Sequence, residues 1–192
     1  MISAIIFDCF GVLTTDAWLP FKTKYFGENI AQFDRAGELN KQSDAGLISY
    51  ESFLDEVGKM AGMSADTVQQ AISNNVPNDA LFEYVRELKQ TYKIGLLSNA
   101  SGDWLSNLFT DKQLVLFDAT AISYDTRFTK PQPEAYETIA ERLGESVSNC
   151  VFIDDQERFV TGATEAGMLA LWYRDMSQLK SELAVILADP KH

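Results

Sequence analysis

The chain has 192 residues, 46% of them hydrophobic, which suffices for one well-buried core and a modest inserted subdomain. Its 28 acidic residues exceed its 16 Lys and Arg residues, and the resulting net charge of -12 disfavours nucleic acid and anionic lipid surfaces as partners. No apolar run approaches the roughly 20 residues that span a bilayer, and the first apolar stretch is too short for a signal peptide. We therefore expect a cytoplasmic protein that does not bind a membrane.

The histidine and cysteine content narrows the possible chemistry. The only histidine is His192, at the end of the sequence, where chains are commonly poorly ordered, so a histidine general base or a histidine-rich metal site is not expected. Cys9 and Cys150 lack metal-ligand spacing, and we expect both to be reduced residues of strands. Any catalysis must then depend on carboxylates, lysine and hydroxyl groups.

Five short apolar segments have the length of β-strands, and most of them are separated by helical patterns. They are residues 2–7, 94–97, 119–122, 150–153 and 168–173. This alternation predicts an α/β fold, in which a doubly wound parallel sheet is covered by helices on both faces.

Helical periodicity predicts three helices between these strands. Apolar residues recur at helical spacing over residues 81–88, after a candidate N-cap at Asp79. A second helix is expected between Pro133 and Gly144, and a third that ends at Gly167. These helices would cover the two faces of the sheet.

Residues 14–78 contain no strand-like run, but they do contain helical patterns, including residues 50–57 and a segment capped by Ser64. We expect this stretch to be a small helical cap inserted into a core formed by residues 1–13 and 79–192. A loop that leaves the carboxyl end of a strand lies above the site in open α/β sheets, so a cap there is placed to exclude water and select the substrate.

Two strand ends carry polar residues suited to a site. The first strand ends at Asp8, and Gly11 permits a tight turn beside this carboxylate. Ser98 and Asn99 end a second apolar strand and supply hydroxyl and amide donors for an anion. Each pattern taken alone is also typical of an ordinary turn.

Lysine and a pair of carboxylates follow later in the chain. Lys130 precedes a proline-rich turn and a helix start, which restricts its backbone and offers a positive charge. Asp154 and Asp155 end a strongly apolar strand. Adjacent carboxylates that converge near a third repel one another unless a cation neutralises them, and such hard oxygen ligands suit Mg²⁺.

In this order, the four positions resemble the signatures of the haloacid dehalogenase (HAD) superfamily, namely a strand-end Asp, a strand-end Ser or Thr, a Lys and an acidic pair. The resemblance spans nearly the whole chain. It extends to AGLISYESF in the insertion and to KPQPEAY at Lys130, which are similar to stretches of the branch that contains haloacid dehalogenases and small phosphatases. A response-regulator receiver also combines Asp, Ser or Thr and Lys, but its acidic pair comes from the first strand.

The resemblance implies a HAD-like Rossmannoid core and a role for each matching residue. Asp8 would be the nucleophile, Ser98 and Lys130 would bind the transferring phosphoryl group, and Asn99 would help to orient the substrate. The Mg²⁺ ligands would be Asp8, Asp154, Asp155 and the backbone carbonyl of Phe10. The implied activity is that of a phosphatase, which hydrolyses a small phosphate ester such as a sugar phosphate through an aspartyl phosphate. The protein would be a monomer or a homodimer.

Phe10 is the main departure from the phosphatase pattern. Phosphatases of the superfamily usually carry at this position a second Asp, which protonates the leaving group and later activates water. General acid–base help is worth about 10²–10⁴-fold, so alkyl phosphates should react slowly unless a cap residue or water substitutes, whereas anomeric or acyl phosphates should suffer less.

Two alternatives follow from Phe10. An aromatic residue at this position resembles the true dehalogenases, which need no metal, so carbon–halogen hydrolysis of 2-haloacids is the second hypothesis. Against it, Asp154 and Asp155 beside Asp8 without a cation would cost several kcal/mol per uncompensated buried charge. The third hypothesis is a phosphate- or metal-binding protein that has lost efficient catalysis.

Overall fold

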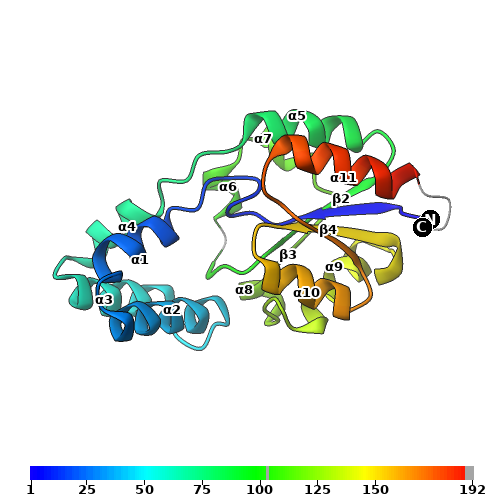
Figure 1. The fold of residues 1–192 in the computed structure, drawn as a ribbon. Helices are drawn as coiled ribbons and strands as arrows, with labels where there is room; N and C mark the ends of the chain where they lie inside the picture. Colours follow the sequence, from blue (N-terminus) through cyan, green and yellow to red (C-terminus); the bar gives the residue numbers. More distant parts are fainter. Residues whose placement is uncertain (103, 189–192) are drawn as a thin grey trace.

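The computed structural model describes residues 1–102 and 104–188, so His192 lies outside the described residues. Its centre is a parallel sheet of five strands in the order β3-β2-β1-β4-β5 (Figure 1). The strands are β1 (Ala4–Phe7), β2 (Lys93–Ser98), β3 (Ala119–Ile122), β4 (Cys150–Asp154) and β5 (Leu169–Trp172). The prediction of an α/β fold with a parallel sheet is confirmed.

Strand ends differ from the predicted ones where pairing extends beyond the apolar run. β2 continues to Ser98, which pairs with Ile122, and β4 continues to Asp154, which pairs with Trp172. The expectation that Cys9 lies in a strand is wrong, because β1 ends at Phe7 and Cys9 lies in the turn that follows; its thiol is nevertheless buried and free.

Helices cover both faces of the sheet, as predicted (Figure 1). Neighbouring residues of β1 point to opposite faces, so Ile5 packs with α5 (Asp79–Leu88) and α11 (Met176–Ala188), while Ile6 packs with α9 (Pro133–Leu143) and α10 (Glu157–Glu165). The shorter helices are α6 (Leu105–Leu108), α7 (Asp111–Leu114), α8 (Ser123–Thr126) and the 3-10 turn η1 (Val147–Asn149). No helix of the described ranges is long and apolar enough to cross a membrane.

The helix boundaries follow the predicted signals closely. The N-cap of α5 is Asn78, whose side chain accepts a hydrogen bond of 3.2 Å from the backbone N–H of Leu81, and Asp79 is the first helical residue rather than the cap. Gly144 ends α9 as predicted, whereas α10 ends two residues before Gly167. The cap at Ser64 is confirmed by its hydrogen bond to the backbone of Thr67.

Four helices lie between β1 and α5, beyond the carboxyl ends of the strands (Figure 1). They are α1 (Trp18–Phe26), α2 (Ile30–Asp44), α3 (Tyr50–Ala61) and α4 (Ala65–Ile72). These helices have a hydrophobic core of their own, formed by Phe21, Phe26, Ala36, Leu39, Phe53, Leu54, Val57 and Val68. We call this unit the helical insertion. The exact division into a core of 1–13 and 79–192 and a cap of 14–78 stays a prediction.

Two connectors that run side by side join the helical insertion to the sheet. The backbone N–H of Thr15 donates to the carbonyl of Val76 at 3.0 Å, and the N–H of Asn78 donates to the carbonyl of Leu13 at 2.8 Å. The N–H of Val76 also donates to Oγ1 of Thr15 at 2.9 Å. We call this paired segment, residues 13–15 with 76–78, the neck.

Candidate active site

Three of the predicted site residues lie at the carboxyl ends of the three central strands. Asp8 follows β1, and its backbone N–H donates to the carbonyl of Ile153 at 2.9 Å, which extends the pairing with β4. Ser98 and Asp154 are the last residues of β2 and β4. Because the strands are parallel neighbours, their ends meet at one edge of the sheet. All three side chains are buried, with exposures of 4%, 1% and 0%.

Lys130 joins two of these strand ends. Its ammonium group donates to Oδ1 of Asp8 at 2.5 Å and to Oδ2 of Asp154 at 2.6 Å, and its side chain is buried. Burial alone would lower the pKa of Lys130, but the charges of Asp154 and Asp8 outweigh this effect and raise the pKa above its ordinary value. Lys130 is therefore a permanent positive charge at the centre of the cluster.

Asn99 holds the backbone of Lys130 in place. Its Oδ1 accepts a hydrogen bond of 2.8 Å from the Lys130 N–H, and its Nδ2 donates to the Lys130 carbonyl at 3.0 Å. The structure thus gives Asn99 a positioning contact that the sequence did not indicate. Contact of Asn99 with a substrate stays a prediction.

Two buried oxygen atoms of the cluster lack partners within the described residues. They are Oγ of Ser98 and Oδ1 of Asp155. A buried polar atom without a hydrogen bond costs about 1–3 kcal/mol, so such atoms are rare outside sites that bind something. Both atoms are available to a ligand at this edge of the sheet.

Three carboxylates are brought together beside Lys130. Asp8, Asp154 and Asp155 each offer an oxygen atom, and these atoms lie within 4.8 Å of one another. Burial raises the pKa of Asp8 above its ordinary value, against the opposing charge of Lys130, and burial together with Asp154 raises the pKa of Asp155 to about 6. One lysine leaves the ionised cluster with an excess of negative charge, so its donor set fits a hard divalent cation such as Mg²⁺.

Gly11 is required by the close approach of Asp155. Its φ of +90° lies in the left-handed region, and a Cβ atom built there would lie 2.3 Å from Oδ2 of Asp155. Any side chain at this position would displace the carboxylate. The turn glycine noted in the sequence is therefore required by the position of Asp155 in the carboxylate cluster as well as by the turn.

Phe10 packs its ring against Trp104, with ring centroids 4.8 Å apart. Its side chain thus belongs to an apolar contact beside the cluster and offers no proton. The backbone carbonyl of Phe10 as a metal ligand stays a prediction.

Two cations near this edge were not singled out from the sequence. Lys22 of α1 and Arg158 of α10 belong to the helical insertion and to the core, respectively, and neither forms an ion pair within 4.0 Å in the described part of the chain. Burial lowers the pKa of Lys22, and the nearby charge of Arg158 lowers it further. Exposed lysines and arginines are common, so only the fold reveals this pair.

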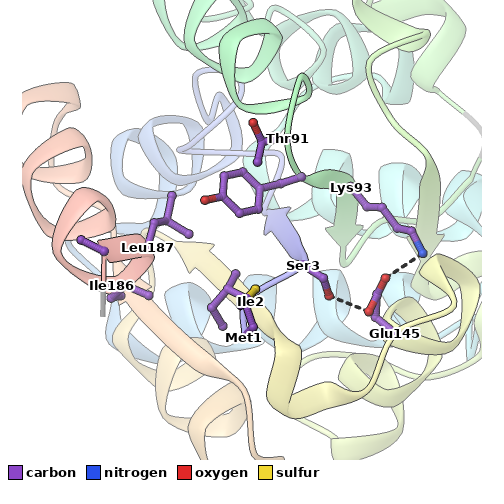
Figure 2. A pocket seen from close by; sticks show the side chains of 10 residues that line it. Met1, Ile2, Ser3, Thr91, Lys93, Glu145, Ile186 and Leu187 are labelled. Atoms are coloured by element: carbon purple, nitrogen blue, oxygen red, sulfur yellow. Dashed lines mark hydrogen bonds and ion pairs between the residues drawn. The ribbon is translucent and has the colours of Figure 1, made fainter. Parts of the chain in front are cut away.

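A pocket of about 500 Å³ lies at the opposite edge of the sheet. Figure 2 shows its lining side chains, which come from the start of β1, the start of β2 and the end of α11. There, Oγ of Ser3 donates to Glu145 at 2.5 Å, and Lys93 pairs with Glu145 at 2.7 Å. No residue of the carboxylate cluster is among the described residues that line it, so the cluster is the better candidate for chemistry.

The fold and the cluster together define a class of α/β protein whose site is built from carboxylates at the ends of parallel strands. The model of the haloacid dehalogenase-like hydrolase family matches residues 2–167. The chain therefore belongs to the haloacid dehalogenase-like hydrolases, as its sequence signatures predict.

Similar proteins and solved structures agree with this assignment. The chain is 28% identical to phosphatase MT3486 of Mycobacterium tuberculosis, across 88% of this chain and 86% of that protein. HAD family enzyme BT-2542 of Bacteroides thetaiotaomicron is 26% identical, with a TM-score of 0.75 over 93% of this chain and 98% of that one. L-2-haloacid dehalogenase of Xanthobacter autotrophicus shares the fold, with 22% identity and a TM-score of 0.64 over 99% and 85% of the two chains.

Proposed function

We propose that the protein is a Mg²⁺-dependent phosphatase that acts on a small phosphate ester through an aspartyl phosphate at Asp8. The observation that carries this proposal is the cluster of Asp8, Asp154 and Asp155 around buried Lys130, beside the unpartnered hydroxyl of Ser98. Two similar proteins support it: MT3486 is named a phosphatase, and BT-2542, in a structure 25% identical to this chain, is a complex with magnesium and inorganic phosphate.

The metal would be held by Asp8, Asp154, Asp155 and the backbone carbonyl of Phe10. When bound, Mg²⁺ supplies positive charge that offsets the repulsion between an anionic nucleophile and an anionic phosphate. The partnerless Oδ1 of Asp155 and the excess negative charge of the cluster are the features that fit such an ion.

Each residue of the site would have a separate role in phosphoryl transfer. The carboxylate of Asp8 attacks phosphorus, while Lys130 and the hydroxyl of Ser98 bind the phosphoryl oxygens whose charge grows in the transition state. Asn99 keeps Lys130 in position through its backbone. Water then attacks the phosphorus of the aspartyl phosphate, which releases phosphate and restores Asp8.

The cations Lys22 and Arg158 support an anionic substrate. In a chain with a net charge of -12, Lys22 and Arg158 lack ion-pair partners in the described residues, and they lie close enough for the charge of Arg158 to lower the pKa of Lys22. Their positive charge would attract an anionic, phosphorylated small molecule to this part of the surface.

A second candidate is hydrolysis of a carbon–halogen bond. The observation that favours it is Phe10, because a halide leaves without a proton and an aromatic residue at this position resembles the true dehalogenases. The three clustered carboxylates disfavour it, since that chemistry needs no cation to hold them together.

Two assays run in parallel separate the two candidates. One measures phosphate release from sugar, acyl and aryl phosphates, with Mg²⁺ and with EDTA, and the other measures halide release from 2-haloacids. We expect Mg²⁺-dependent phosphate release that falls by more than about 10⁴-fold in Asp8→Asn. The control is Asp55→Asn, which removes an exposed carboxylate of α3 and should leave the rate unchanged. Metal-independent halide release would overturn the phosphatase proposal in favour of a dehalogenase, and no release in either assay would favour a binding protein.

A further inference from the structure

Cleavage of an alkyl phosphate needs a proton donor that the core does not supply. The oxygen atom that leaves phosphorus must be protonated unless it departs as a stable anion. Phe10 has no proton to give, and Lys130 is held by two carboxylates that raise its pKa. A donor must therefore come from another part of the molecule.

A carboxyl group of the helical insertion lies at the same edge of the sheet as the cluster. Asp44 is the last residue of α2, and its backbone carbonyl accepts a hydrogen bond of 2.6 Å from Oγ of Ser123, which begins α8 directly after β3. The same Oγ accepts a hydrogen bond of 3.0 Å from the N–H of Ala100, two residues beyond Ser98. The end of α2 is thereby docked onto the carboxyl ends of β2 and β3.

The side chain of Asp44 has the environment of a proton donor. Its Oδ2 accepts a hydrogen bond of 2.8 Å from Asn40, while Oδ1 has no hydrogen-bond partner in the described part of the chain. Burial raises the pKa of Asp44 to about 7, although the nearby charge of Lys130 lowers it. A group with a pKa close to the working pH is an effective donor, and it recovers its proton readily.

We infer that Asp44, docked by Ser123 beside Lys130, is the general acid of the reaction, an inference that rests on the proposed phosphatase function. As the bond between Asp8 and phosphorus forms and the bond to the leaving oxygen breaks, the Asp44 carboxyl transfers its proton to that oxygen and the alcohol departs. In the second half, Asp44 takes a proton from the water that attacks phosphorus, the Asp8–phosphorus bond breaks, and phosphate leaves.

Because Asp44 is the last residue of α2, the site has its proton donor only when α2 is docked against the core. The nucleophile, the lysine and the metal ligands belong to the core, whereas the proton donor belongs to the helical insertion. Proton transfer from Asp44 then depends on the contact between α2 and the core. This dependence favours protonation of a bound substrate over side reactions with water.

The test compares wild type, Asp44→Asn and the control Asp55→Asn on two substrates with Mg²⁺: glycerol 3-phosphate, whose leaving group needs a proton, and acetyl phosphate, whose leaving group does not. We expect Asp44→Asn to lower kcat for glycerol 3-phosphate by about 10²–10⁴-fold and for acetyl phosphate by less than about tenfold. The wild-type rate on glycerol 3-phosphate should fall as the pH rises through about 7, and this fall should be absent in Asp44→Asn.

Each other outcome is informative. Equal losses on both substrates, a change in KM alone, or an unaltered pH profile would overturn the role of Asp44 while leaving the phosphatase intact. If wild type releases phosphate from neither substrate nor from the wider panel, the proposed function fails and this inference fails with it. If Asp44→Asn does not fold, as judged by urea unfolding, Ser123→Ala tests the docking instead and should reduce glycerol 3-phosphate turnover more than acetyl phosphate turnover.

Discussion

The sheet and the helical insertion bury different kinds of side chain. At the carboxyl ends of the strands, three ionisable side chains, Asp8, Lys130 and Asp154, are almost fully buried. In the helical insertion, the buried side chains that the structure describes are apolar except for Ser43, and Asp44 is only half-buried at its edge. A buried charge is tolerated only with its partners, whereas an apolar core tolerates exchange of similar volumes. The core is therefore constrained by chemistry and the helical insertion by packing.

The largest expected effect comes from breaking the buried charge network. Lys130→Met leaves Asp8 and Asp154 without their common partner and should lower the free energy of unfolding by about 3–5 kcal/mol in urea denaturation without added Mg²⁺. Lys59→Met is the matched change in the helical insertion, where it breaks an exposed pair with Glu56, and should have no measurable effect. Similar small effects for both variants would contradict the view that the core depends on paired charge.

Two glycines with positive φ sharpen the comparison further. Gly62→Ala, at the end of α3, strains only the backbone, since a Cβ there meets nothing within 4 Å, and should cost roughly 1–2 kcal/mol of stability. Gly11→Ala has the same kind of strain and also collides with Asp155. It should therefore be more destabilising and should weaken Mg²⁺ binding, measured by calorimetry, by at least about tenfold. Equal effects of the two variants would show that Asp155 moves freely.

A pH dependence should distinguish the edge of the helical insertion from its surface. The pKa of Asp44 is raised from 3.8 to about 7 by burial, so the folded state holds its proton more tightly than the unfolded state. The resulting stability is fully present below pH 3.8 and is lost as the pH rises through about 7. The free energy of unfolding of wild type, measured with urea, should thus fall relative to that of Asp44→Asn as the pH rises from 3.8 to about 7. Asp55→Asn should have the same pH dependence of stability as wild type. If Asp44→Asn also has the wild-type pH dependence, the raised pKa of Asp44 is refuted.

The smallest expected effect concerns the exposed cation Arg158. Arg158→Gln should lower kcat/KM by roughly two- to fivefold at low salt, because an exposed charge contributes about 0.2–1 kcal/mol to attraction of an anion, and the loss should shrink as salt is added. Arg86→Gln removes an exposed charge of α5 on the other face of the sheet and should change nothing. A loss that does not depend on salt would indicate a structural role for Arg158.

Much of the core was predictable from the sequence because strand-end chemistry follows from local patterns. A buried parallel strand is a continuous apolar run, so its end is visible where Asp8, Ser98 or Asp154 interrupts the run. The parallel topology then brings these ends together without further information. The clustering of the acidic pair with Asp8 follows from this rule, whereas Lys130 lies in the connection between α8 and α9 and is not placed by it.

The contacts that tune the site were not predictable, because they join residues far apart in sequence. The bonds between Asn99 and the backbone of Lys130, and between Ser123 and the carbonyl of Asp44, depend on how loops and helices dock. Neither has a residue pattern that separates it from an ordinary loop or helix end. The boundary of α5 was misplaced by one residue for a related reason, since Asn78 and Asp79 are both good caps and only the fold decides between them.

The neck has a consequence for how such a protein changes its specificity. The chain enters the helical insertion through residues 13–15 and leaves it through residues 76–78, and the two connectors are hydrogen-bonded to each other at Thr15 and Val76. An insertion with adjacent entry and exit points can be exchanged as a module without altering the pairing or register of any strand. Chimeras that transplant helices across this joint would keep Asp8, Lys130 and the clustered carboxylates, and would inherit both a different choice of substrate and a different proton donor.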